Sequence, residues 1–259
     1  MTQPLLSIIT INFNHAKGLQ RTINSVTSQT FEDLEYLIID GASKDESTAV
    51  IEKNADKIDH WVSESDTGIY NAMNKGIKAA KGQYLLFLNS GDVLSGRTAL
   101  ADFIGHHDFK GDIIYGDYKF EEGEKVYPDT LTPIFFMRSS LPHQSTLFKS
   151  TVFDEMGLYD ESYQISADRA FYAKCFASGN VQFTHLSYPL AVFDLSGMSN
   201  DPKHLQKKLE EDERLLRAAF GERYDGYMAQ LQEQRAMSEA KYKGLMGIFR
   251  RINRKFRKR

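Results

Sequence analysis

Short apolar runs alternate with helical patterns through the first half of the chain. Leu5–Asn12 (LLSIITIN) and Leu34–Asp40 (LEYLIID) are rich in β-branched residues, and a helical segment at Lys17–Gln29 lies between them. The alternation continues with a helix at Ser47–Lys53, a strand at Asp59–Val62, a helix at Tyr70–Ala80 and a strand at Tyr84–Leu88. Apolar strands joined by helices predict βαβ units and a mostly parallel sheet covered on both faces.

The second half of the chain has shorter strand patterns, separated by Gly, Pro and charged turns. Strands are predicted at Ile113–Gly116, Lys125–Tyr127 and Ser145–Phe148, followed by a helix at Ala167–Ser178 and a strand at Leu190–Phe193. This pattern predicts a mixed extension of the same sheet. Helical patterns continue from Pro202 onward. The sequence therefore predicts an α/β fold with a helical C-terminal extension.

Polar residues follow three of the predicted strands at the point where each strand ends. Thr10 and Asn12 close the first strand, Asp40 begins the run DGASKD after the second, and NSGD follows a later strand at residues 89–92. Turn formation alone accounts for the glycines in these runs. An acid directly after a buried strand, however, is costly to desolvate unless it has a partner. Because ligands of open α/β sheets bind at the carboxyl ends of the strands, we expect a nucleotide or a hard cation there.

Composition narrows the class of protein. Hydrophobic residues make up 41% of the chain and charged residues 26%, as in ordinary soluble domains. The single cysteine, Cys175, cannot form an internal disulfide, and its helical context predicts a small core residue. No apolar run of about 18 residues and no signal-peptide pattern is present, so we expect a cytoplasmic location without a membrane span.

Other nucleotide-dependent enzyme classes lack their motifs in this sequence. A nicotinamide dehydrogenase needs GxGxxG after the first strand, whereas residues 14–18 are NHAKG. A P-loop and the Gly-rich basic loop of a sugar-nucleotide pyrophosphorylase are also missing.

Five segments in a fixed order carry a family resemblance. They are SIITINFN, LIIDGASKDES, SESDTGIYNAMNKGIKAAKGQYLLFLNSGD, PHQSTLFK and ISADRAF. Together they resemble family 2 of the glycosyltransferases, in the bacterial exopolysaccharide and O-antigen branch that includes the colanic acid transferases. The resemblance covers roughly residues 4–200, and the long middle segment is its most specific part. It implies a GT-A fold, a nucleotide-diphosphate sugar donor, a divalent cation and inversion at the anomeric carbon.

The resemblance also implies a division of the chain. Residues 1–200 correspond to the GT-A domain, with the nucleotide-sugar half at about 1–120 and the acceptor half at about 120–200. Residues 201–259 form the helical extension, which ends in a basic tail at 241–259.

Several positions match the family's donor site. Thr10 and Asn12 match residues that line the nucleotide pocket, and Asp40 matches the acid that binds the base, usually uracil. Asp66 lies in the loop beneath the nucleotide, and Asn74, with Gly76, matches the motif on the diphosphate side. These assignments predict a UDP-sugar as the donor.

The metal tract departs from the family pattern. The family usually has Asp-x-Asp after this strand, whereas this chain has Asn89, Ser90, Gly91 and then Asp92. Asparagine and a hydroxyl are weaker ligands than carboxylates for Mn²⁺ or Mg²⁺. We therefore expect metal to bind through Asp92, together with His143 or water, when the donor diphosphate is present.

Asp168 matches the family's general base. It stands at the start of a predicted helix, so an ordinary first-turn acid is the alternative interpretation. The family's second acid is absent, because Ala167 and Arg169 flank Asp168. His143, after a proline and before a strand, is either a structural histidine or a donor to the diphosphate or metal.

A loop and two aromatic residues complete the set of candidates. Ser196–Ser199 (SGMS) resembles the family's Gly-Gly-x-Ser and is either a closing loop or a flexible connector. Tyr70 and Trp61 are large enough to stack on a sugar or base, although core packing is the commoner role.

The last residues form a basic amphipathic pattern. Residues 241–259 contain nine Lys or Arg and no acid, whereas the remaining chain has 23 basic against 35 acidic residues. Apolar residues recur every three or four positions in the tail, as in helices that lie on anionic membranes. A solvated or oligomer-forming helix is the alternative. An acidic body without a nucleic-acid-binding fold argues against nucleic acid as the partner.

These observations favour an inverting glycosyltransferase of the hexosyltransferase type in bacterial surface polysaccharide synthesis. Its acceptor is expected to be a lipid-linked glycan at the inner face of the cytoplasmic membrane. A catalytically inactive nucleotide-sugar-binding relative or scaffold is the second hypothesis.

Overall fold

The computed structural model describes residues 3–194 and 202–256, and it describes side chains as far as residue 240. Within these residues the strands are β1 (Leu6–Asn12), β2 (Leu34–Asp40), β3 (His60–Ser63), β4 (Tyr84–Phe87), β5 (Val93–Leu94), β6 (Ile113–Phe120), β7 (Gly123–Lys125), β8 (Thr146–Lys149) and β9 (Phe183–Val192). The helices are α1 (Ala16–Thr27), α2 (Ser47–Lys53), α3 (Ile69–Ala79), α4 (Ala99–Ile104), α5 (Pro133–Arg138), α6 (Ser150–Met156), α7 (Ala167–Ser178), α8 (Leu205–Phe220) and α9 (Tyr224–Phe256).

The strands form one mixed sheet in the order β3-β2-β1-β4-β8-β6-β9-β5, with β7 paired to β6. The pairs β3–β2, β2–β1 and β1–β4 are parallel, as the alternation of strands and helices predicts. β8 is antiparallel to both β4 and β6, and β6 is parallel to β9. The predicted mixed extension is therefore confirmed. The carboxyl ends of the first four strands share one edge, where ligands of such sheets bind.

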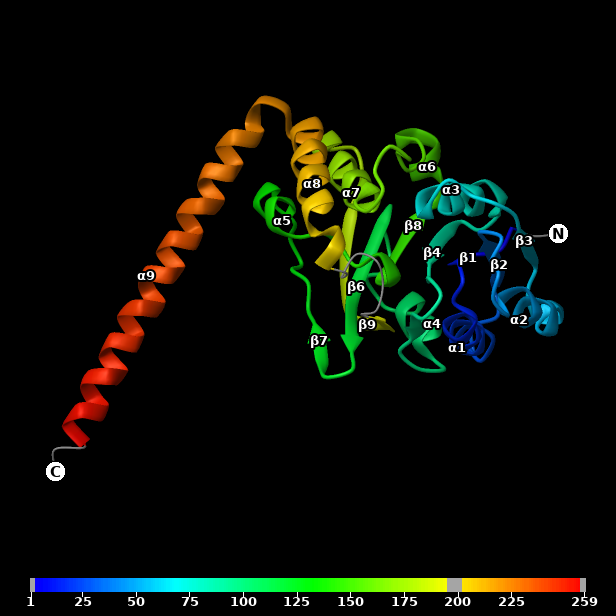
Figure 1. Cartoon of the computed structure of the whole chain (residues 1–259), viewed down its shortest axis with the longest axis horizontal. Coiled ribbons are helices and arrows are strands. Elements are labelled where there is room, and N and C mark those ends of the chain that lie inside the picture. The colour runs from blue at the N-terminus through cyan, green and yellow to red at the C-terminus, as the bar shows by residue number, and fades with distance from the viewer. Residues whose placement is uncertain (1–2, 195–201, 257–259) are drawn as a thin grey trace.

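Helices cover both faces of the sheet (Figure 1). One core contains residues of α3, α5, α6, α7 and α8, and the other contains residues of α1, α2 and α4. Cys175 is buried in the first core, in agreement with the expectation for a small core residue.

The helical extension is continuous with the body at α8. Leu215, Leu216 and Phe220 of α8 are buried in the same core as Phe171 and Tyr172 of α7. The domain boundary at residue 200 stays a prediction, but α8 packs as part of the main fold.

α9 leaves the body as a long helix, and its end lies far from the sheet (Figure 1). Tyr224 and Leu231 near its start are buried, whereas residues 232–240 are exposed. Among the described residues, no helix combines the length and the apolar character that crossing a bilayer requires.

Candidate active site

Asp40 is held by hydrogen bonds where β1 and β2 end. Asn12 and Asp40 are partners in the parallel ladder, and Asn12 Nδ2 donates to Asp40 Oδ1 at 2.7 Å. Ser43 donates to the carboxylate through Oγ at 2.5 Å and through its backbone N–H at 2.9 Å, and Ser63 Oγ donates at 2.6 Å. Burial by itself raises the pKa of Asp40, but these hydrogen bonds outweigh it and lower the pKa below the usual value. Asp40 is thus a fixed, ionised and fully buried carboxylate with both oxygens hydrogen-bonded inside the protein; its contact with a base stays a prediction.

Asp66 lies beside the same turn. A Cβ on Gly41 would collide with the Asp66 carboxylate, so glycine lets the two loops approach each other. Asp66 Oδ1 also accepts the N–H of Gly68 at 3.1 Å, just before α3 begins. Phe13, which the sequence analysis did not single out, is 64% exposed and lies next to Gly41. Its position directly after β1, between two asparagines, is the signal that could have identified it.

Thr10 lies beneath this edge and is fully buried. Its hydroxyl donates to the carbonyl of Leu88 at 2.8 Å and lies 3.0 Å from the Tyr36 hydroxyl. In this structure Thr10 joins the ends of two strands. Its contact with a nucleotide stays a prediction.

Asn74 connects α3 to the segment before α7. Its Nδ2 donates to the Tyr159 carbonyl at 2.9 Å and to Glu161 Oε1 at 2.8 Å, and its Oδ1 accepts the Tyr159 N–H at 3.0 Å. A Cβ on Gly76 would collide with Ile9, so this glycine allows α3 to pack closely on β1. Both matched positions hold the wall of the site together, and donor contact by Asn74 stays a prediction.

The turn at residues 89–92 presents several oxygen atoms at the end of β4. Asn89 Oδ1 and Ser90 Oγ are buried and have no hydrogen-bond partner among the described residues. Asp92 is 5% exposed and accepts the Asp194 N–H at 2.8 Å. Burial raises the pKa of Asp92 to about 7; the Asp194 charge adds to the rise, while the Asp194 N–H and Arg21 oppose it.

Asp194 brings a second carboxylate to this turn from the end of β9. Gly91 has φ of 111°, and a Cβ there would meet Asp194 Oδ2 at 2.7 Å. The same carboxylate pairs with Arg21 at 2.6 Å. The sequence analysis missed Asp194. Its only signal was an acid directly after a strand, as for Asp40. The neighbouring loop Ser196–Ser199 lies outside the described residues.

Asp168 lies in the first turn of α7 and is half-buried. The Tyr70 hydroxyl, from the first turn of α3, lies 2.9 Å from Asp168 Oδ1 and 2.6 Å from the Ile165 carbonyl oxygen, so it can donate to either. Because α3 follows the Asp66 loop, this contact joins the predicted base to the donor side of the site.

His143 is packed inside the site. Its Nε2 lies 2.9 Å from the Tyr159 hydroxyl, and its ring stacks on Phe87 with 4.7 Å between ring centroids. Burial lowers the pKa of His143 to about 4, although the Asp168 charge opposes the shift. The ring is therefore neutral near pH 7, and its Nε2 contacts Tyr159; a hydrogen bond from His143 to the diphosphate or metal stays a prediction.

The two candidate aromatic residues differ in their surroundings. Tyr70 is 5% exposed and uses its hydroxyl to contact the Asp168 region. Trp61 is partly buried and packs against the core on the α1–α2 side. Stacking of Tyr70 or Trp61 on a sugar or base stays a prediction.

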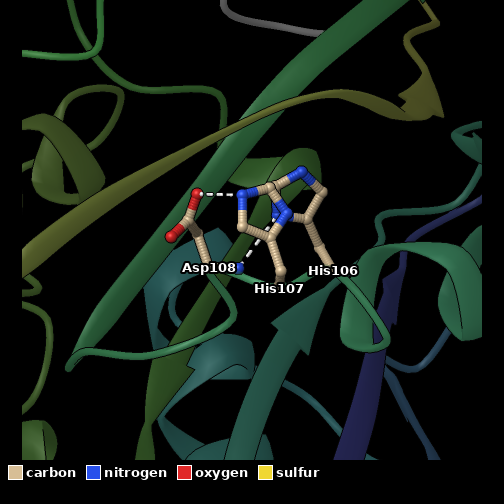
Figure 2. Close-up of side chains that lie close together, drawn as sticks. All are labelled: His106, His107 and Asp108. Carbon is tan, nitrogen blue, oxygen red and sulfur yellow. Dashed lines mark hydrogen bonds and ion pairs between the residues drawn. The ribbon is translucent and has the colours of Figure 1, made fainter.

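A separate group of metal-ligating side chains lies in the loop after α4. His106, His107 and Asp108 offer ligand atoms within 4.8 Å of one another (Figure 2). The Asp108 carboxylate is also paired with Lys110, at 3.6 Å. The backbone carbonyl of Gly111, three residues after Asp108, accepts a hydrogen bond from the hydroxyl of Tyr84, the first residue of β4. The cluster therefore lies at the amino end of that strand, away from the edge that carries Asp40 and Asp92.

The model of the family described as "Glycosyl transferase family 2" matches residues 7–159, more than half of the chain. This chain belongs to glycosyl transferase family 2. An uncharacterized glycosyltransferase of Mycobacterium tuberculosis is 35% identical over 176 residues, covering 65% of this chain and 67% of the relative. A PGL/p-HBAD biosynthesis glycosyltransferase of Mycobacterium bovis is 30% identical over 229 residues, which cover 83% of this chain and 88% of the relative. The predicted class of enzyme, a glycosyltransferase, is thus confirmed.

Solved structures confirm the GT-A-like fold of this family 2 glycosyltransferase. S. aureus TarS 1–349 in complex with UDP-GlcNAc matches with a TM-score of 0.70 at 19% identity, covering 88% of this chain and 71% of that chain. This chain spans 42% of a longer TarS chain. A mannosyltransferase from Pyrobaculum calidifontis, in complex with GDP-Man and Mn²⁺, matches with a TM-score of 0.60 at 14% identity, covering 92% and 81%.

Proposed function

We propose that this family 2 enzyme transfers a sugar, with inversion, from a UDP-linked donor to a hydroxyl group of a glycan in bacterial surface polysaccharide synthesis. The observation that carries the proposal is the fixed, ionised Asp40 at the strand edge that also carries the acidic turn at Asp92. Asp168 is joined to this edge through Tyr70. The solved neighbour that holds UDP-GlcNAc supports the choice of donor.

Nucleotide recognition falls to the Asp40 side of the site. An ionised carboxylate is a strong acceptor for the ring N–H of uracil. The exposed ring of Phe13 beside Gly41 offers a face on which a base can stack, and such stacking is worth roughly 1–3 kcal/mol. Asp66, whose carboxylate lies beside Gly41, is an acceptor for a ribose hydroxyl.

The turn at residues 89–92 suits a divalent cation. The oxygens of Asn89 and Ser90, which lack a partner in the described part of the chain, and the carboxylates of Asp92 and Asp194 are the kind of oxygen ligand that Mg²⁺ and Mn²⁺ prefer. Asp194 thereby compensates for the missing Asp-x-Asp tract. A bound cation would offset the charge that develops on the leaving diphosphate. The solved neighbour in complex with GDP-Man and Mn²⁺ supports metal use in this fold.

Asp168 is proposed as the general base. Its half-buried carboxylate can take the proton from the attacking acceptor hydroxyl, a role worth about 10²–10⁴-fold in rate. The Tyr70 hydroxyl contacts Oδ1 of this carboxylate, and we assign the proton transfer to Oδ2. A base on the side of the sugar opposite the leaving diphosphate gives inversion.

The acceptor is proposed to be lipid-linked, at the inner face of the cytoplasmic membrane. The basic tail at 241–259 and a relative named for PGL biosynthesis support this part of the proposal. Nucleic acid is not proposed as a partner.

Donor hydrolysis across a panel of UDP- and GDP-sugars, with Mn²⁺, with Mg²⁺ and with EDTA, tests the proposal. We expect turnover of one UDP-sugar and its loss in EDTA. Tight UDP binding without turnover of any donor, with a lipid-linked acceptor fraction added, would instead support the inactive relative.

A further inference from the structure

A buried carboxylate on α8 holds the backbone that leads into α7. Glu211 is 3% exposed and accepts three consecutive backbone N–H groups, from Gln164 at 2.8 Å, Ile165 at 3.0 Å and Ser166 at 3.0 Å. Hydrogen bonds to a carboxylate are about twice as strong as neutral ones. The negative charge also lies near the positive end of α7. This cap therefore fixes a segment that ends two residues before Asp168.

The peptide at Ile165 is held from two sides. Its N–H donates to Glu211 of α8, and its carbonyl lies 2.6 Å from the hydroxyl of Tyr70 of α3. The same hydroxyl lies 2.9 Å from Asp168 Oδ1. The position of Ile165 consequently sets where Tyr70 can meet Asp168.

Neighbouring residues of α8 hold the same segment. Asp212 forms an ion pair with Arg169, directly after Asp168. Arg214 donates to the Ser162 carbonyl at 3.1 Å, and its guanidinium lies 3.9 Å from the centroid of the Tyr163 ring. One turn of α8 thus contacts both sides of the segment that carries Asp168.

We propose that Glu211 is a positioning residue, which sets the geometry of Asp168 through the peptide at Ile165. The inference rests on the proposed function, in which Asp168 is the base. Neither Glu211 nor Asp168 lies in the part of the chain that the family model matches, residues 7–159. A misplacement of about 1 Å can cost a hundredfold in rate, so a cap on this backbone controls catalysis without touching a substrate.

The experiment compares Glu211→Gln with Glu210→Gln, the same change at the neighbouring exposed position of α8. Glutamine keeps the size of Glu211 but turns an NH₂ group toward backbone donors. We expect Glu211→Gln to lower kcat about 10- to 100-fold for the UDP-sugar that the enzyme turns over. The Kd of UDP should change less than twofold, because Asp40 and its partners are unaltered. Glu210→Gln should match the wild type in both measurements.

A double-mutant cycle separates positioning from a general structural effect. In the Asp168→Asn background, Glu211→Gln should add less than a twofold loss, because the group that it positions has already been removed. An equal loss in both backgrounds, or wild-type kcat in Glu211→Gln, would overturn the proposal.

Amide hydrogen exchange in the same variants gives a readout that needs no turnover. Exchange at residues 165–169 should be at least tenfold faster in Glu211→Gln than in Glu210→Gln. Equal exchange overturns the cap as a positioning device. A wild type that turns over no donor, with the exchange difference intact, places the failure in the proposed function instead.

Discussion

Asp168 gives the most direct test at the scale of single residues. Asp168→Asn keeps the size of the side chain and can keep the contact with Tyr70. The amide, however, cannot take the proton from the attacking hydroxyl of the acceptor substrate. We expect kcat to fall about 10²–10⁴-fold with an unchanged Kd for UDP. Asp154→Asn, at an exposed position, serves as the control. An Asp168→Asn enzyme that binds UDP normally and turns over at the wild-type rate would exclude Asp168 as the base.

Asp194 tests the second carboxylate of the metal turn. In Asp194→Asn we expect the affinity for Mn²⁺ in the presence of UDP to fall at least tenfold, because one charged oxygen ligand is lost. Electron paramagnetic resonance of free Mn²⁺ measures this without turnover. Asp56→Asn, an exposed acid, is the matched control. Equal Mn²⁺ affinity in the two variants would remove Asp194 from the proposed ligand set.

The lowered pKa of His143 predicts that the free energy of unfolding depends on pH. Its pKa in the folded protein is about 4, below the usual value near 6.5, so the unfolded chain binds a proton that the folded protein excludes. The contribution of His143 is therefore fully present above pH 6.5. As the pH falls from 6.5 toward 4, the contribution of His143, roughly 3 kcal/mol, should be lost, whereas Asp92, with its pKa raised to about 7, contributes in the opposite sense over this range.

Urea unfolding between pH 7 and pH 4.5 measures this slope. The difference in the free energy of unfolding between wild type and His143→Gln should shrink as the pH falls, whereas the difference between wild type and His107→Gln should stay constant, because the His107 side chain is 82% exposed. Parallel slopes for the wild type and both variants would show that His143 is not the titrating group.

Single residues also show how far sequence reasoning reaches. Asp40 could be predicted because it is the first polar residue after a buried run, and the structure places it at the edge of the sheet. Asp194 could not be assigned, because its partner Asp92 is 102 positions away and a different strand brings the two together. The contacts of Glu211 could not be predicted either, because a helical pattern does not show which backbone N–H groups a buried acid will accept from.

At the scale of elements, an apolar run predicted β2, and helical patterns predicted α2 and α7, all with the observed bounds. β9 was predicted only at Leu190–Phe193, but it begins at Phe183. His185, Ser187 and Pro189 interrupt its apolar pattern, and its pairing with β6 passes through register shifts near Gly116 and Asp117. Long-range pairing, rather than local pattern, extends this strand.

β7 was likewise predicted at Lys125–Tyr127 but lies at Gly123–Lys125, because it pairs back onto β6 through a short turn.

The basic end of α9 is the element that tests membrane binding. Deleting residues 241–259 removes nine basic side chains, each worth about 1 kcal/mol near an anionic surface. We expect binding to phosphatidylglycerol vesicles to fall at least tenfold, and UDP binding to stay the same. Vesicles of phosphatidylcholine alone are the control. Unchanged binding of the shortened protein to the anionic vesicles would refute the role of the tail.

At the scale of the whole molecule, α8 should be essential for the stability of the body. Phe220 is 4% exposed in the core that also holds α7, so Phe220→Ala should lower the free energy of unfolding by about 3–5 kcal/mol. Leu209→Ala, at a residue 56% exposed on the same helix, should change it by less than about 0.5 kcal/mol. Urea denaturation of both variants is the measurement. A small effect of Phe220→Ala would mean that the extension folds independently of the body.

The continuity of α9 has a consequence for orientation. The helix runs for 33 residues, roughly 50 Å, from a start buried in the body. If its basic end lies along a bilayer, the same rigid rod fixes the angle at which the body stands above the lipid. The tail would then set the orientation of the candidate active site relative to the bilayer, in addition to keeping the enzyme at the membrane. A Gly-Ser insertion within residues 236–240 would preserve vesicle binding but remove that aim, so transfer to acceptors embedded in vesicles should suffer while transfer to detergent-dispersed acceptors should not.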